Sequence, residues 1–114
     1  MKGTYYRLNK KNEVEDCSWE QYCEDVQNFN STRRINESFS EDKKIKVSTV
    51  FLALDHNGGM FETMLFMEDK LHIKVFDEID EQERCHTYDD ALKQHDKMCD
   101  DISKIIKQEF VQNA

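Results

Sequence analysis

The chain has no proline and only three glycines among its 114 residues. This scarcity excludes collagen-like proteins and proline-rich or glycine-rich low-complexity chains. No stretch approaches the roughly 18 consecutive apolar residues of a membrane-spanning helix, and residues 1–8 lack the apolar centre of a signal peptide. We therefore expect one globular domain over residues 1–114 that is located in the cytoplasm and does not associate with a membrane.

The sequence motifs of common catalytic and cofactor sites are also missing. The chain contains neither a GxGxxG nor a GK[ST] pattern for phosphate binding, and its four cysteines form no CxxC pair. In a chain without an export signal these cysteines are expected to be reduced thiols: Cys17, Cys23, Cys85 and Cys99. We predict no metal ion and no cofactor, and we expect a binding protein rather than an enzyme.

Positive charge is scarce in the second half of the chain. Residues 1–57 contain nine Lys/Arg and ten Asp/Glu, a balance of −1, whereas residues 58–114 contain seven and fourteen, a balance of −7. An acidic half repels phosphate backbones, so we expect no direct binding of nucleic acid. The same charge favours a partner protein with a basic surface.

Apolar spacing predicts two helices. Ser18 is a candidate N-cap with Gln21 in the capping-box position, and apolar residues then recur at spacings of three and four: Trp19, Tyr22, Cys23, Val26 and Phe29. Thr87 and Asp90 mark the start of the second helix, whose apolar stripe continues to Phe110. Both stripes are typical of helices that pack on a sheet.

Alternating and β-branched residues predict five strands, at 5–8, 33–39, 46–55, 60–67 and 71–76. The second of these is weak and is expected at an edge. Gly58 and Gly59 mark a turn, so residues 46–67 are predicted to form a central hairpin. The fold class is α+β, with a mainly antiparallel sheet of about four to five strands and two helices packed on one face, in the order β-α-β-β-β-β-α.

Four ionisable residues are candidates for a functional cluster: Asp55, His56, Glu62 and His95. If the last helix crosses the sheet near the hairpin turn, they could form a small metal-dependent or acid–base enzyme site. In the alternative interpretation Asp55 stabilises the turn, His56 is solvated, and His95 lies under the sheet with one ring nitrogen hydrogen-bonded. The structural interpretation has more weight, because turns and helices commonly use these residues in this way.

An acidic belt runs from Asp77 to Asp101, with ten Asp/Glu against three Lys/Arg. The common role of such a belt is a solvated face that keeps a protein soluble. The functional alternative is a surface that imitates the phosphates of a nucleic acid. Its candidate partner-binding residues are Asp77, Glu78, Asp80, Glu81, Glu83, Asp89 and Asp90.

The central hairpin also carries a recognisable motif. The run VSTVFLALDH from Val47 to His56, followed by FETM at 61–64, resembles an uncharacterised family of small phage and prophage proteins with a VSTVFLGLDH…FETM motif. The family's helix start of the form T-x3-A-x3-H is matched by Thr87, Ala91 and His95, and an upstream tryptophan helix by Trp19. The resemblance covers residues 17–98. Here Ala53 replaces the usual glycine, and the turn is shorter.

The resemblance implies a mobile-element origin but no particular activity. The leading hypothesis is therefore a phage or prophage accessory protein that binds a host protein with a basic surface. In its sharper form it inhibits a nucleic-acid-handling or defence system of the host. The alternatives are the enzyme built on the Asp55, His56, Glu62 and His95 cluster, and a structural protein that forms a homodimer or larger homo-oligomer.

Overall fold

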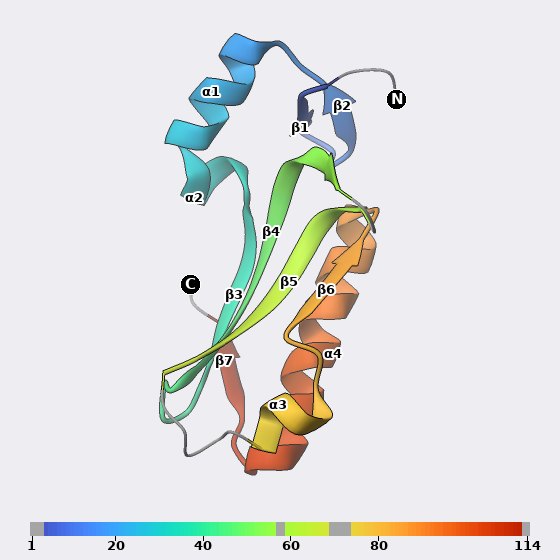
Figure 1. The fold of residues 1–114 in the computed structure, drawn as a ribbon. Helices are drawn as coiled ribbons and strands as arrows, with labels where there is room; N and C mark the ends of the chain where they lie inside the picture. Colours follow the sequence, from blue (N-terminus) through green and yellow to red (C-terminus); the bar gives the residue numbers. More distant parts are fainter. Residues whose placement is uncertain (1–3, 57–58, 69–73, 113–114) are drawn as a thin grey trace.

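The structure, a computed structural model, describes residues 4–56, 59–68 and 74–112. An N-terminal hairpin of β1 (Tyr6–Leu8) and β2 (Val14–Asp16) leads into α1 (Trp19–Gln27) and the short α2 (Phe29–Thr32). The chain continues through β3 (Arg34–Ser40), β4 (Ile45–His56), β5 (Gly59–Met67), α3 (Lys74–Glu78) and β6 (Gln82–Cys85). It ends with α4 (Tyr88–Ile106) and β7 (Phe110–Gln112), as Figure 1 shows.

The five-stranded sheet has the order β6-β5-β4-β3-β7, and each neighbouring pair is antiparallel. The predicted α+β class and the central β4–β5 hairpin are confirmed. β3 is an inner strand and not the predicted edge strand, because β7 pairs with its outer side. The predicted turn at Gly58 lies outside the described residues.

Helix α4 covers one face of this sheet (Figure 1). Thr87 caps it as predicted, because the Thr87 hydroxyl accepts a hydrogen bond from the backbone N–H of Asp90 at 3.1 Å. Alternate residues of β4 and β5 face the helix and are nearly fully buried: Ile45, Val47, Thr49, Phe51, Phe61, Thr63 and Leu65. Thr49 and Thr63 lie opposite each other on the two strands, and this polar pair lies between two apolar clusters of the core.

The upper part of the β4–β5 hairpin contains two unusual backbone positions. The register shifts between Phe51 and His56, and within this irregularity Ala53 has a φ of 64° while its side chain is buried. Gly59 has a φ of 127°, and a Cβ atom there would lie 2.0 Å from the backbone oxygen of Cys85. Only glycine fits position 59, because both the conformation and the space exclude a side chain.

The strand predicted at residues 71–76 is wrong where the structure describes it. Residues 74–76 belong to α3, and residues 69–73 lie outside the described part. Val75 is fully buried in the same apolar cluster as Met98 and Ile102 of α4, and Ile79, four residues further on, packs against that cluster. This spacing is helical, so the alternation of Leu71, Ile73 and Val75 was misleading.

The predicted helix at residues 18–29 is confirmed in position but not in its packing. Ser18 caps α1 and accepts from the N–H of Gln21 at 3.1 Å. The helix contacts β1 and α2 at the end of the molecule, beyond the sheet face that α4 covers (Figure 1). Its apolar stripe is largely exposed, with exposed fractions of 54 % for Trp19 and 42 % for Val26.

Candidate functional site

The structure separates the two described members of the predicted acid–base cluster. Thr63 of β5 faces α4, so the adjacent Glu62 side chain projects from the opposite face of the sheet. His95 lies between α4 and the sheet, on the other side of the strands from Glu62. The backbone of His56 pairs with Gly59, while the side chains of Asp55 and His56 lie outside the described part. Glu62 and His95 therefore cannot act on one substrate.

Glu62 belongs instead to a group of polar side chains on the open face of the sheet. Its carboxylate oxygen Oε2 accepts a hydrogen bond from Arg84 Nε at 2.9 Å and a second one from the Gln82 side-chain amide. The Glu62 side chain is 9 % exposed and the Arg84 side chain 29 %. Because the strand register places Glu62 directly opposite Arg84, this ion pair is a cross-strand contact that joins β5 to β6.

His95 is 1 % exposed and uses both of its ring nitrogens. Nε2 lies 2.8 Å from Ser38 Oγ on β3, and Nδ1 lies 2.8 Å from Thr49 Oγ1 on β4. The position under the sheet agrees with the structural interpretation, but two ring nitrogens are bonded where one was expected. The histidine therefore connects α4 to two strands.

Two further residues extend this polar layer. Thr49 Oγ1 lies 2.6 Å from Thr63 Oγ1, and Gln94 Nε2 donates to Thr63 Oγ1 at 2.9 Å and to the carbonyl of Glu83 at 3.0 Å. We call the side chains of Ser38, Thr49, Thr63, Gln94 and His95 the polar layer. It connects β3, β4 and β5 with α4, and through the Glu83 carbonyl also β6.

The Gln94 amide fixes the direction of the hydrogen bonds in the polar layer. An amide nitrogen only donates, so Thr63 Oγ1 accepts a hydrogen bond from Gln94. Among the described residues, the only acceptor for the hydroxyl proton of Thr63 is Thr49 Oγ1. Thr49 in turn donates to His95 Nδ1. The ring then carries its proton on Nε2 and donates to Ser38.

This direction of bonding bears on the chemistry of Ser38. A serine nucleophile needs a histidine nitrogen that is free to take its proton. In the polar layer Nε2 already holds a proton, so His95 does not activate the Ser38 hydroxyl. The arrangement is a structural one, with each buried polar group paired.

Burial shifts the pKa values of two groups next to this layer. Desolvation lowers the pKa of His95 below its usual value, and the nearby Asp96 carboxylate only partly opposes this effect. Burial raises the pKa of the Cys99 thiol to about 11, although a hydrogen bond with Ser38 acts in the opposite direction. At neutral pH Cys99 is therefore a thiol and not the nucleophilic thiolate, and both ring nitrogens of the uncharged His95 are occupied within the polar layer.

A cavity of about 570 Å³ lies between α4, β3 and β7, beside Ser38 and Cys99. Three carboxylates contribute to its lining, those of Asp96, Asp100 and Glu109, and they give it a negative charge. The sequence did not predict this cavity, because Phe110 was expected at the end of the last helix, whereas it begins strand β7. The described residues, these three carboxylates included, contain no group of three or more His, Cys, Asp or Glu side chains placed to hold a metal ion.

The acidic belt is divided in space. Asp77, Glu78, Asp80 and Glu81 are exposed on α3 and the turn after it, and we call these four the acidic segment. Asp89 and Asp90 are exposed in the first turn of α4. Asp101, near the other end of α4, shares a surface hollow with Glu78 and Asp80 of the acidic segment. Since a helix rises about 1.5 Å per residue, Asp90 lies about 16 Å along the helix axis from Asp101.

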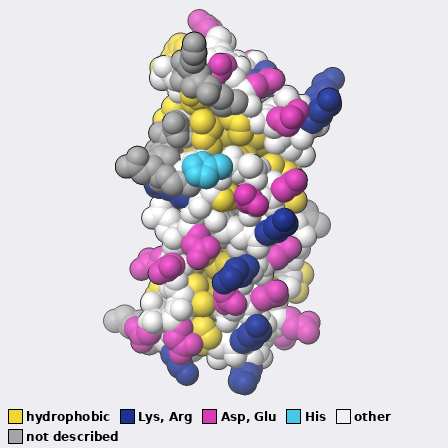
Figure 2. All heavy atoms as spheres, turned by 90° about the vertical axis from the view of Figure 1, so that its right-hand side faces the viewer, with side chains coloured by type: hydrophobic (Ala, Val, Ile, Leu, Met, Phe, Trp, Pro, Cys, Tyr) yellow, Lys and Arg dark blue, Asp and Glu magenta, His cyan; other side chains and the backbone are white. Residues whose placement is uncertain are grey.

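Lysines interrupt the negative charge of the α4 face. Figure 2 shows basic and acidic side chains alternating over this side of the molecule. Lys97 forms an ion pair with Asp101 at 2.7 Å, and Lys74 forms one with Glu78 at 3.6 Å. Glu83 is half-buried in the hollow beside Lys97. The structure therefore brings together four of the predicted contact residues and separates Asp89 and Asp90 from them.

Comparison with models of known protein families, with curated protein sequences and with solved structures found no match to this chain. Among the described residues, no helix combines the length and the apolar character that crossing a lipid bilayer requires.

Proposed function

We propose that the protein acts by binding another protein that has a basic surface, and that the acidic segment is a contact site. The observation that supports this proposal is the exposure of four carboxylates within five residues, Asp77 to Glu81. Of these, only Glu78 forms an ion pair with a lysine within the described chain. Exposed carboxylates that form no ion pair within the described residues are available to lysine and arginine side chains of a partner.

The resemblance to phage and prophage proteins gives this proposal its biological setting. In that setting the partner is a protein of the bacterial host, and the complex forms in the host cytoplasm. The acidic segment then competes with nucleic acid for the basic groove of a nucleic-acid-handling or defence protein. The alternative partner is a second copy of the chain, which the experiment below distinguishes.

A capture experiment from host lysate tests the proposal. The protein is immobilised and partners are collected at low and at high salt, because ion pairs at an exposed surface weaken as salt screens them. The test variant is Asp77→Lys with Asp80→Lys, and the matched control is Asp96→Lys with Asp100→Lys, which changes the net charge by the same amount. All four residues are exposed.

The expected result is a captured protein that is released by salt, is lost with the test variant and is retained by the control. Equal capture by both variants would show that overall charge and not the acidic segment is responsible. A species that consists of the chain itself, seen by light scattering, would favour the homo-oligomer.

A further inference from the structure

Helix α1 exposes an apolar stripe that no other described segment covers. Trp19 and Val26 are seven residues apart and therefore lie on the same side of the helix, with exposed fractions of 54 % and 42 %. Phe29, at the start of α2, is 39 % exposed. We call these three side chains the apolar stripe. A stripe with this spacing is the usual anchor pattern when a helix docks against an apolar surface.

Aromatic stacking holds the first residue of the stripe in place. The Trp19 ring stacks on Tyr22 with a centroid distance of 5.7 Å and an interplanar angle of 18°, and Tyr5 contacts both rings at 5.2 and 5.0 Å. The guanidinium of Arg33 lies over the Tyr22 ring, 4.7 Å from its centre. Trp19 is therefore exposed and also pre-positioned, which reduces the entropy that binding has to overcome.

The charge around the stripe indicates what kind of partner fits. Helix α1 contains no lysine or arginine, and its acidic residues Glu20 and Glu24 are exposed beside the stripe. Arg33, whose guanidinium lies over the Tyr22 ring, is largely buried. A second copy of the chain would bring the same negative charge to this surface and be repelled. A positively charged partner is attracted to it.

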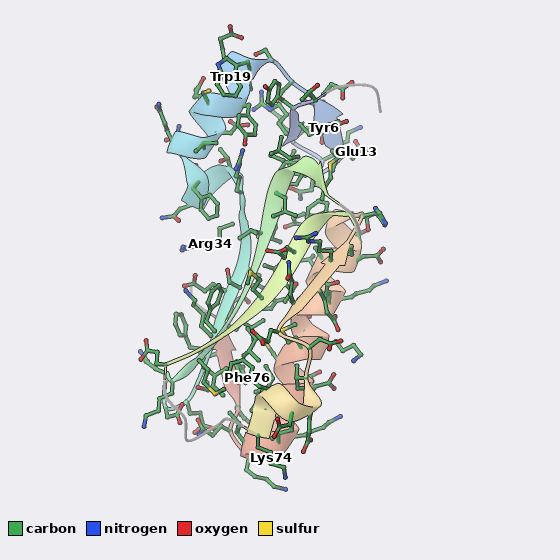
Figure 3. The ribbon with its side chains drawn as sticks, in the orientation of Figure 1. Tyr6, Glu13, Trp19, Arg34, Lys74 and Phe76 are labelled. Carbon is green, nitrogen blue, oxygen red and sulfur yellow. The ribbon has the colours of Figure 1, made fainter. Side chains whose placement is uncertain are left out.

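We propose that the apolar stripe of α1 and α2, with the acidic residues around it, binds an amphipathic segment of another protein whose apolar face is flanked by lysine or arginine. This inference deepens the proposed function by adding a second contact site. Figure 3 shows that Trp19 lies at the opposite end of the molecule from Lys74 and Phe76, which belong to α3 beside the acidic segment. The two sites can therefore be disabled separately.

Trp19 is the only tryptophan, so its fluorescence reports on this surface alone. The probe is a synthetic helical peptide of leucine and lysine with one leucine face, titrated into the full-length protein. The comparison peptide has the same composition in scrambled order. We expect saturable binding with a blue shift of the Trp19 emission for the amphipathic peptide, and affinity at least about tenfold weaker for the scrambled one.

Three variants complete the test. Val26→Ser with Phe29→Ser should weaken binding by about tenfold or more, because it removes two apolar contacts, and Glu20→Lys with Glu24→Lys should weaken it and reduce its salt dependence. Asp77→Lys with Asp80→Lys should leave it unchanged. Circular dichroism of each variant checks that the fold is retained.

Equal binding of both peptides, or unaltered binding by the Val26 and Phe29 variant, would overturn the inference in favour of general charge attraction. Absence of saturable binding would overturn it as well. Concentration-dependent dimerisation that the same variant abolishes would identify a second copy as the occupant. None of these results affects the acidic segment, which the lysate experiment tests separately.

Discussion

Replacing Thr49 by valine tests whether the polar layer stabilises the fold. Valine keeps the shape of threonine but removes the hydroxyl that accepts from Thr63 and donates to His95 Nδ1. Thr63 and His95 are 0 % and 1 % exposed, so water cannot replace the lost partner. Each buried polar group left without a partner costs about 1–3 kcal/mol, and the additional buried methyl group returns about 1 kcal/mol. The variant should lose about 1–5 kcal/mol of unfolding free energy.

The serine variant at the same position is the control. Thr49→Ser keeps the hydroxyl and loses one methyl group, which costs about 1 kcal/mol. Side-chain volume and β-propensity both predict that valine is the better substitute, whereas the polar layer predicts the reverse order. Urea unfolding followed by circular dichroism measures both variants. If Thr49→Val is as stable as the natural protein, or more stable than Thr49→Ser, the described hydrogen bonds do not stabilise the fold.

Other predictions follow from single positions. Because the pKa of buried His95 is lowered in the folded protein, the unfolded chain binds a proton more readily. The free energy of unfolding should therefore fall by up to about 1.4 kcal/mol per pH unit below pH 6.5. Urea titrations at pH 7.5 and 5.5 should show a smaller loss for the His95→Gln variant than for the natural protein. Gly59→Ala should destabilise the fold by more than about 2 kcal/mol, because of its φ and the contact with Cys85, and a melting temperature near that of the natural protein would contradict this. Ala53→Gly should change the free energy of unfolding by less than about 1 kcal/mol, because relief of the positive φ offsets the lost methyl group. Ala53→Val should lower the melting temperature much more than Ala53→Gly does. Cys99, with its pKa of about 11, should react with a thiol reagent at pH 8 only in denaturant, and rapid labelling of the folded chain would place it at the surface.

Local signals were sufficient for the central part of the fold. The hairpin of β4 and β5 followed from long alternating runs, and the start of α4 followed from Thr87 and Asp90, whose hydrogen bond involves neighbours in the sequence. The short strands β2, β6 and β7 were not predicted. Each contains only three or four residues. β6 and β7 are defined by pairing with strands distant in the sequence, as Phe110 of β7 pairs with Ser40 of β3, while β2 pairs with the equally short β1. Tertiary pairing of this kind leaves little trace in a short segment.

The sequence contains a signal for the polar layer. Thr49 and Thr63 occupy inward positions of the two strands, where the alternation otherwise places apolar side chains such as Val47 and Phe61. Two polar residues at inward positions require a buried partner, and His95 on the apolar stripe of the last helix is the residue that provides it. The matches to the T-x3-A-x3-H pattern have the same explanation, because Thr87 caps α4, Ala91 is fully buried and His95 bonds the sheet. These residues served the fold, and the enzyme hypothesis had assigned one of them to catalysis.

Charge sums over half of the chain concealed the most uniformly acidic stretch. The first half has a balance of −1, but all nine of its lysines and arginines lie outside residues 13–32, a stretch that contains six acidic residues. The acidic belt from Asp77 to Asp101 has a larger count, yet Lys93 and Lys97 fall within the same helix as Asp90 and Asp101 and reduce its field. A partner responds to the charge within about a Debye length of its own surface, which is roughly 8 Å at physiological salt. Surface charge therefore has to be assessed among neighbours in space. The exposed Glu20 and Glu24 beside Trp19 make α1 a second candidate contact site in addition to the acidic segment.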